Sequence, residues 1–124
     1  MAAPNIVNIS TLTGKTVVTN LTTASATSVL SNAASSGKVF RLLMLRVVNV
    51  DGYNSVNITA NLYSEDDIGG TATELIQSKG LGTNTYLDII TRDSPLYLEE
   101  DRSLGVTASA ANDAKVIVTY EEIS

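Results

Sequence analysis

The sequence predicts an all-β fold, an antiparallel β-sandwich of jelly-roll type with about eight to ten short strands. Three observations support this prediction. The 124 residues include 15 Thr, 13 Ser and 10 Asn, which disfavour helices because they are β-branched or bond to their own backbone. Apolar and polar residues alternate at a period of two in several short runs. Gly, Asn and Asp residues separate these runs at the spacing of turns.

The clearest strand is residues 56–63, in which apolar and polar residues alternate from Val56 to Tyr63. The same period recurs at residues 115–121. A half-buried strand has this pattern because successive side chains point to opposite faces of a sheet. One face of each strand is therefore expected to pack in the core, while the other meets solvent or a partner.

Residues 38–50 form a longer apolar run that predicts a strand with two apolar faces. One face would carry Phe40, Leu42, Met44, Val48 and Val50, and the other would carry Val39, Leu43, Leu45 and Val47. An antiparallel sheet in a small domain usually hides only one face. The second face, Val39, Leu43, Leu45 and Val47, is therefore the predicted contact surface for another subunit.

Asp51 and Gly52 follow this run and predict a tight turn, so residues 38–50 and 56–63 are expected to form a hairpin. The segment 22–37 is too rich in Ser and Thr for a stable isolated helix and is interpreted as a strand flanked by loops. The other expected strands are residues 6–9, 16–21, 28–30, 75–79, 86–91, 96–98 and 104–108.

The length predicts a single β-sandwich domain over residues 1–124, with residues 1–12 as an N-terminal arm. Pro4 and Ile6 are the predicted contact residues of that arm. The N-terminus lacks the basic start and apolar stretch of a signal peptide, and no apolar run could span a bilayer. We therefore expect a soluble protein that is made in the cytoplasm and binds no membrane.

Charge and composition exclude several classes of function. The formal net charge is −5, and the eight Lys and Arg residues form no run, so nucleic-acid binding is not expected. His, Cys and Trp are absent, which removes the commonest acid–base catalyst, the thiolate nucleophile and most zinc ligands. The acidic residues around Asp66 and Glu99 are interpreted as solvated turns. We expect no enzymatic activity, no cofactor and no metal.

Five Tyr in a chain with one Phe are the remaining feature of interest. Tyr63 lies on the polar face of the clearest strand, where its ring could serve an interface, so it joins the predicted contact residues. Simple packing at the rim of the core is the alternative. An exposed row of Tyr53, Tyr63 and Tyr97 would instead indicate a carbohydrate-binding module.

Several segments resemble small virion structural proteins of tailed phages, in particular marine and cyanobacterial phages. The strongest is residues 94–108, Ser-Pro-Leu-Tyr-Leu-Glu-Glu-Asp-Arg-Ser-Leu-Gly-Val-Thr-Ala, in which Asp101 stands where that group usually has glycine. The other matching segments are residues 1–8, 34–40, 49–52, 110–113 and 116–124.

The resemblance implies a jelly-roll subunit displayed in many copies on a particle. We expect a capsid decoration or cement protein in the virion that contacts the major capsid protein or other virion proteins as a homo-oligomer, with a trimer favoured. A neck, tail or fibre component and a carbohydrate-binding adhesion module are the alternatives. An enzyme would require a cleft that gathers Asp88, Asp93, Glu99 and Asp101.

Overall fold

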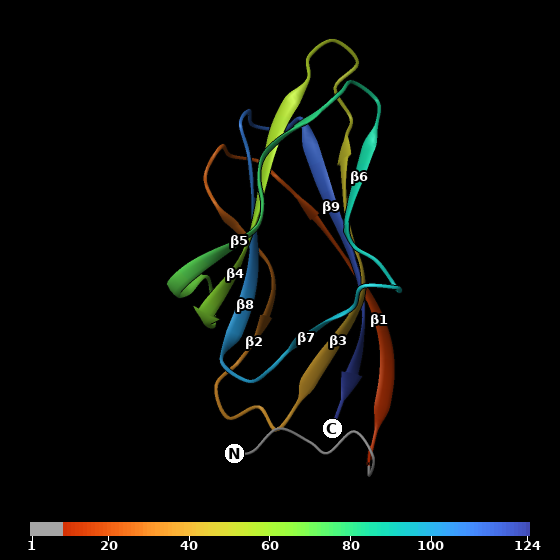
Figure 1. Ribbon diagram of the computed structural model, residues 1–124, viewed down its shortest axis with the longest axis vertical. Helices are drawn as coiled ribbons and strands as arrows, with labels where there is room; N and C mark the ends of the chain where they lie inside the picture. Colours follow the sequence, from red (N-terminus) through yellow and green to blue (C-terminus); the bar gives the residue numbers. More distant parts are fainter. Residues whose placement is uncertain (1–8) are drawn as a thin grey trace.

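The computed structural model describes residues 9–124, which form two antiparallel β-sheets packed face to face (Figure 1). Sheet A has the order β1-β9-β3-β6, with β7 also paired to β3, and lies to the right in Figure 1. Sheet B has the order β2-β8-β4-β5 and lies to the left. The strands are β1 (Leu12–Asn20), β2 (Thr27–Asn32), β3 (Val39–Asn49), β4 (Val56–Glu65), β5 (Gly69–Leu81), β6 (Tyr86–Ile90), β7 (Leu96–Leu98), β8 (Arg102–Ala108) and β9 (Ala114–Ile123). The predicted all-β sandwich is confirmed.

The strands pair as nested partners along the chain. β1 pairs with β9, β2 with β8, β3 with β6 and β7, and β4 with β5, all antiparallel. The chain is therefore one long hairpin whose tip is the β4–β5 turn. The hairpin is wrapped so that its successive strand pairs lie alternately in sheet A and sheet B. Two further ladders, β3–β9 and β4–β8, join the partners side by side. This order is that of a jelly roll.

The core fills the space between the two sheets. Leu42, Leu45 and Val47 of sheet A face Ile58 and Val106 of sheet B, and all five side chains are fully buried. The alternation along the first half of β4 and along β9 follows the period of two that the sequence shows. The hydrophobic pattern thus places the core as expected in these two strands.

Two buried asparagines tie the sheets together at opposite ends of the sandwich. Asn32 of β2 donates from its amide to the carbonyl oxygens of Lys38 and Leu98, at 2.9 and 3.0 Å. Asn49 of β3 donates to the carbonyl oxygens of Asn54, Leu81 and Gly82, at 3.0–3.1 Å. These carbonyl groups lie at or next to the ends of strands, where the amides supply hydrogen-bond donors to buried polar groups.

The predicted hairpin between residues 38–50 and 56–63 is wrong. β3 lies in sheet A and β4 in sheet B, and no ladder joins them. A two-residue hairpin turn at Asp51–Gly52 would need a left-handed backbone, but Gly52 has no positive φ. Asp51 instead accepts a hydrogen bond from the backbone N–H of Tyr53, at 2.8 Å, in a loop that crosses between the sheets.

The described part of the predicted N-terminal arm, residues 9–12, leads directly into the first strand of sheet A. The backbone of Thr11 exchanges hydrogen bonds with Ser124, and β1 begins at the next residue. Pro4 and Ile6, the predicted contact residues of the arm, and most of the expected strand 6–9 lie outside the described residues.

Asp101 stands where the similar phage proteins usually have glycine. Its φ is 58°, the left-handed conformation that glycine adopts most readily.

Replacing Asn49 with alanine should lower the free energy of unfolding by about 2–4 kcal/mol, because three carbonyl groups lose their donor inside the protein. The measurement is urea unfolding. Asn20→Ala is the matched control, since Asn20 is exposed at the end of β1 and should change stability by less than about 0.5 kcal/mol. Equal losses in the two variants would contradict the role of the buried amide.

Candidate assembly surface

An irregularity in β3 decides which of its residues face outward. The β3–β9 register shifts between Leu42 and Met44, so the two sides of the strand exchange roles there. Leu42 faces the core before the shift, and Leu45 and Val47 face it afterwards, each with 0% exposure. The prediction that Leu45 and Val47 form a contact surface is therefore wrong. Val39 is also buried, and Leu43 is half-buried at the shift itself.

One signal in the sequence could have revealed this shift. Arg41 and Arg46 are five residues apart, so a regular strand would direct them to opposite faces. Both are half-exposed and each is paired to an acidic residue of sheet A, which requires one extra residue between them. Two charged residues at opposite parity in an apolar strand thus favour a bulge.

The outer face of sheet A carries several exposed apolar side chains, although Leu45 and Val47 are not among them. Its rows follow from the β1–β9, β3–β9 and β3–β6 registers. The most exposed aliphatic side chain is Val18, at 63%, and it lies beside the half-buried Ile117. Seven apolar or aromatic side chains of this face are exposed or only partly buried. They are Leu12, Val18, Met44, Val48, Ile117, Tyr86 and Tyr97.

Several polar groups of the same face are paired with one another. Arg46 binds Asp88 through two hydrogen bonds, Nε to Oδ1 at 2.7 Å and Nη2 to Oδ2 at 3.1 Å. Its guanidinium group also lies 4.3 Å from the ring centroid of Tyr86. The hydroxyl groups of Thr16 and Thr119 are 3.1 Å apart. Since a paired polar group costs less to cover than a free one, this face is suited to contact another protein.

Glu122 holds two lysines beside β1. Its carboxylate oxygens lie 2.6 Å from Nζ of Lys15 and 2.6 Å from Nζ of Lys38. The hydrogen bond from Lys15, followed by that from Lys38, keeps the pKa of Glu122 below its usual value. The same contact raises the pKa of Lys15. The lysine in the middle of β1 is therefore drawn toward β9.

Tyr63 lies on the outer face of sheet B, as the alternation predicts, but it is only 8% exposed. Its neighbour across the β4–β8 ladder is Ser103, and its ring covers Gly105. A Cβ atom on Gly105 would lie 2.8 Å from Cε2 of Tyr63 and 3.0 Å from Cγ2 of Ile68. Tyr63 therefore packs flat on a glycine and presents little surface to a partner.

A tyrosine platform for carbohydrate is not formed. Tyr53 is exposed in the loop after β3, whereas Tyr97 pairs opposite Arg41 near the start of that strand. The length of β3 between them is about 25 Å. With Tyr63 buried, the three rings share no row.

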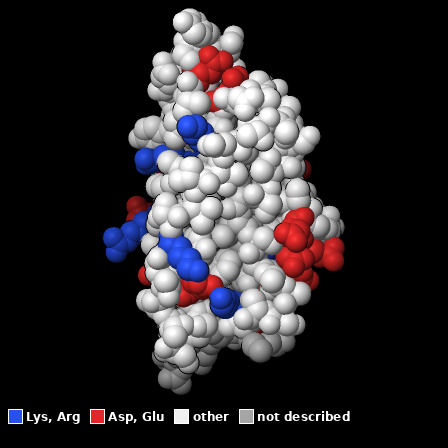
Figure 2. All heavy atoms as spheres, turned by 180° about the vertical axis from the view of Figure 1, so that it is seen from behind, with Lys and Arg blue, Asp and Glu red and all other residues white. Residues whose placement is uncertain are grey.

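The acidic residues also lie in separate places. Asp88 pairs with Arg46 on sheet A, while Asp101 accepts a hydrogen bond from the backbone N–H of Asp66 at the turns beside sheet B. Within residues 9–124 no three acidic side chains come close enough to hold a metal ion. Figure 2 shows the same separation, with acidic groups at the margins of one side of the molecule and a broad uncharged area between them.

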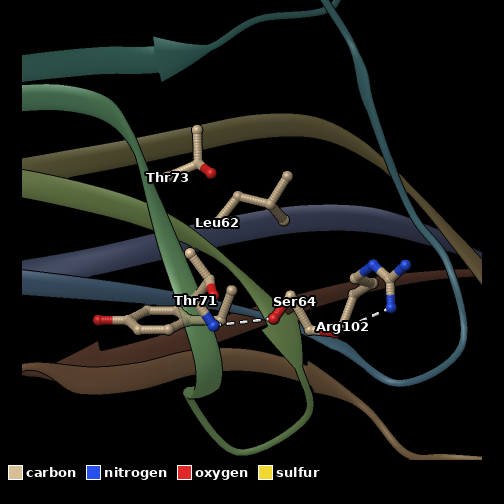
Figure 3. Close-up of a pocket in the computed structure, with 6 residues that line it drawn as sticks. Leu62, Ser64, Thr71, Thr73 and Arg102 are labelled. Carbon is tan, nitrogen blue, oxygen red and sulfur yellow. Dashed lines mark hydrogen bonds between the residues drawn. The ribbon is translucent and has the colours of Figure 1, made fainter.

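A shallow hollow of about 220 Å³ opens beside β4 and β5 (Figure 3). Leu62, Ser64, Thr71 and Thr73 line it together with Arg102. Arg102 donates to the carbonyl oxygens of Ser64 and Asp101, at 2.9 and 3.0 Å. Typical ligand sites have volumes of about 300–1,000 Å³, so the hollow is smaller than these. Arg102, the one positively charged residue that lines it, already binds the backbone.

Comparison with known proteins supports the fold. No protein-family model and no curated protein matches the chain. A chain of the Bacillus endospore appendages, described as disulfide-linked pili, superimposes with a TM-score of 0.52 at 15% identity, covering 91% of this chain and 88% of that one. VP2 of the infectious bursal disease virus subviral particle gives 0.49 at 10%, covering 93% of this chain and 33% of that one. A chain of the T13 particle of that virus gives 0.48 at 10%, covering 93% and 31%.

At 15% identity the pilus chain shows a shared fold and no more. This chain spans about a third of the two viral chains. Residues 9–124 contain no helix long and apolar enough to cross a membrane.

Gly105→Ala should lower the free energy of unfolding by about 1–3 kcal/mol, because the new methyl group meets the ring of Tyr63 and the side chain of Ile68. Gly14→Ala is the control, since nothing lies within 4 Å of a Cβ atom there, and its effect should be neutral or slightly stabilising. Chemical denaturation of both variants measures the difference. A Gly105→Ala protein as stable as Gly14→Ala would show that Tyr63 does not rest on the glycine.

Glu122→Gln should lower the melting temperature at pH 7, and the loss should shrink as the pH falls. The pKa of Glu122 is lower in the folded protein than its value near 4.5 in the unfolded chain. Its carboxylate therefore stabilises the fold at pH values above the unfolded pKa, and this stabilisation is lost as the pH falls through the folded pKa. Thermal melts from pH 7 to about pH 3 measure both proteins. A difference that stays constant over this range would contradict the ion pairs with Lys15 and Lys38.

Proposed function

We propose that this chain is a non-enzymatic structural protein of a tailed-phage virion, a capsid decoration or cement protein. In this proposal the outer face of sheet A contacts the major capsid protein or a neighbouring virion protein. The observation that carries it is the composition of this face, where Met44, Val48 and Ile117 lie near the paired side chains of Arg46 and Asp88 and of Thr16 and Thr119. The resemblance of residues 94–108 to small virion proteins supports the proposed location.

The chemistry of the described residues supports a binding role. Asp88 and Asp101 lie apart, and the one charged group that lines the hollow beside β4, Arg102, donates to backbone carbonyls. The sequence has no His or Cys to supply a conventional nucleophile or base. The pili of the similar chain are described as disulfide-linked. This chain has no cysteine, so its copies cannot be joined by disulfide bonds.

Met44→Glu should weaken binding to capsids that lack this protein by at least about tenfold, because it places an unpaired charge at the centre of the contact face. Co-sedimentation of purified protein with such capsids measures binding. Asn57→Glu is the matched control, since Asn57 is exposed on β4 of the other sheet, and should bind like the wild type. Thermal melts verify that both variants fold.

The outcomes separate the location from the surface. Equal binding by the two variants would contradict the assignment to sheet A. Failure of the wild-type protein to bind capsids, with few copies in purified virions, would contradict the capsid location and favour the neck or tail. The mass of the free protein, measured by sedimentation, tests the predicted trimer.

A further inference from the structure

The four sheet edges in the described chain differ in how they are protected. β5 has several register irregularities against β4, and β2 has one against β8. The far edge of sheet A is divided into β6 and β7 by a turn at residues 91–94 and by Pro95. Interruptions of this kind prevent an edge from accepting another strand. β1 has none: its nine residues pair with β9 in one unbroken register.

The unpaired backbone groups of β1 can be assigned from its ladder. Thr11 and Ser124 exchange two hydrogen bonds, N to O at 2.9 and 3.0 Å. Because such pairs alternate in an antiparallel ladder, the odd-numbered residues of β1 bond to β9 and the even-numbered residues point away from it. No strand within residues 9–124 pairs with that side. The outward N–H and C=O groups belong to Leu12, Gly14, Thr16, Val18 and Asn20.

The side chains of β1 also permit close approach. Lys15 is its one charged residue, and its Nζ is held 2.6 Å from Glu122 on the β9 side. Gly14 has no side chain, and Val18 is 63% exposed. The usual devices against edge pairing, a free lysine or a proline, are therefore absent from this strand.

We propose that β1 of one copy pairs antiparallel with β1 of a second copy, about a two-fold axis at Thr16. This register uses the full strand, so that Leu12 meets Asn20 and Gly14 meets Val18 of the second copy. Opposed residues are then all outward-bonding, and about ten main-chain hydrogen bonds form by the antiparallel pattern. Lys15 faces Val17 of the second copy, so no like charges are directly opposed. The bulk of Val18 lies over a glycine.

The pairing joins the two A sheets into one continuous sheet and extends the outer face of sheet A across the dimer. It rests on β1 alone and does not depend on what that face binds. A two-fold contact produces a dimer of the free protein, whereas the resemblance to phage proteins favours a trimer.

Cysteine cross-linking tests the pairing, because the chain has no cysteine of its own. Cα atoms of a hydrogen-bonded antiparallel pair are about 5.5 Å apart, within disulfide range. Thr16→Cys, with oxidised glutathione as the oxidant, should therefore form a covalent dimer at least about tenfold faster than Thr119→Cys. The control is matched because both variants lose the same Thr16–Thr119 hydrogen bond. In the proposed dimer the two Thr119 positions are about 14 Å apart. Equal rates, or no dimer from Thr16→Cys, would overturn the proposal.

Charge exchange at the same residue tests the register. Thr16→Lys and Thr16→Glu should each sediment as monomers, because two like charges meet on the axis, and a mixture of the two should sediment as dimers. Either variant remaining dimeric alone, or a mixture that stays monomeric, would overturn the register. Wild-type protein that stays monomeric at high concentration would overturn the pairing itself, whereas capsid binding by that monomeric wild-type protein would leave the proposed function intact.

Discussion

The ladder between β3 and β9 is the contact on which the rest of the structure depends. β3 lies between β9 and the β6–β7 edge, and β9 lies between β3 and β1, so the two strands hold sheet A together. The register shift at Leu42–Met44 directs Leu45 and Val47 into the core and Met44 outward. The same shift brings Arg41 and Arg46 to one face, where each finds an acidic partner. Core and contact surface are thus set by one extra residue.

Local pattern was sufficient where a strand is regular. Alternation predicts the strand at residues 115–121, and flanking turn residues predict the strand at residues 96–98; the structure places β9 and β7 there. Pairing partners could not be predicted in this way. Asp51–Gly52 is chemically a turn, but whether it joins neighbours in one sheet or crosses to the other depends on β8 and β9, which lie more than 50 residues further along the chain.

The contact residues show the same limit. The expected contact residues Leu45 and Val47 were assigned to the wrong face, because a strict period of two does not allow for the extra residue of the bulge. Tyr63 was placed on the correct side of its strand, yet its burial depends on Gly105, a residue 42 positions away in the sequence. Sequence periodicity gives the direction of a side chain, while its exposure depends on what the tertiary fold lays over it.

The nested pairing of the strands has a consequence for how the protein is made. Thr16 and Thr119 are 103 residues apart and lie side by side, and the β1–β9 ladder joins residues at similar separations throughout. Sheet A therefore cannot close until β9 has been synthesised, and β1 must wait with an exposed edge during translation. Folding is a late, concerted event for this chain, so the concentration of nascent chains sets how often β1 meets a foreign strand before its own partner arrives.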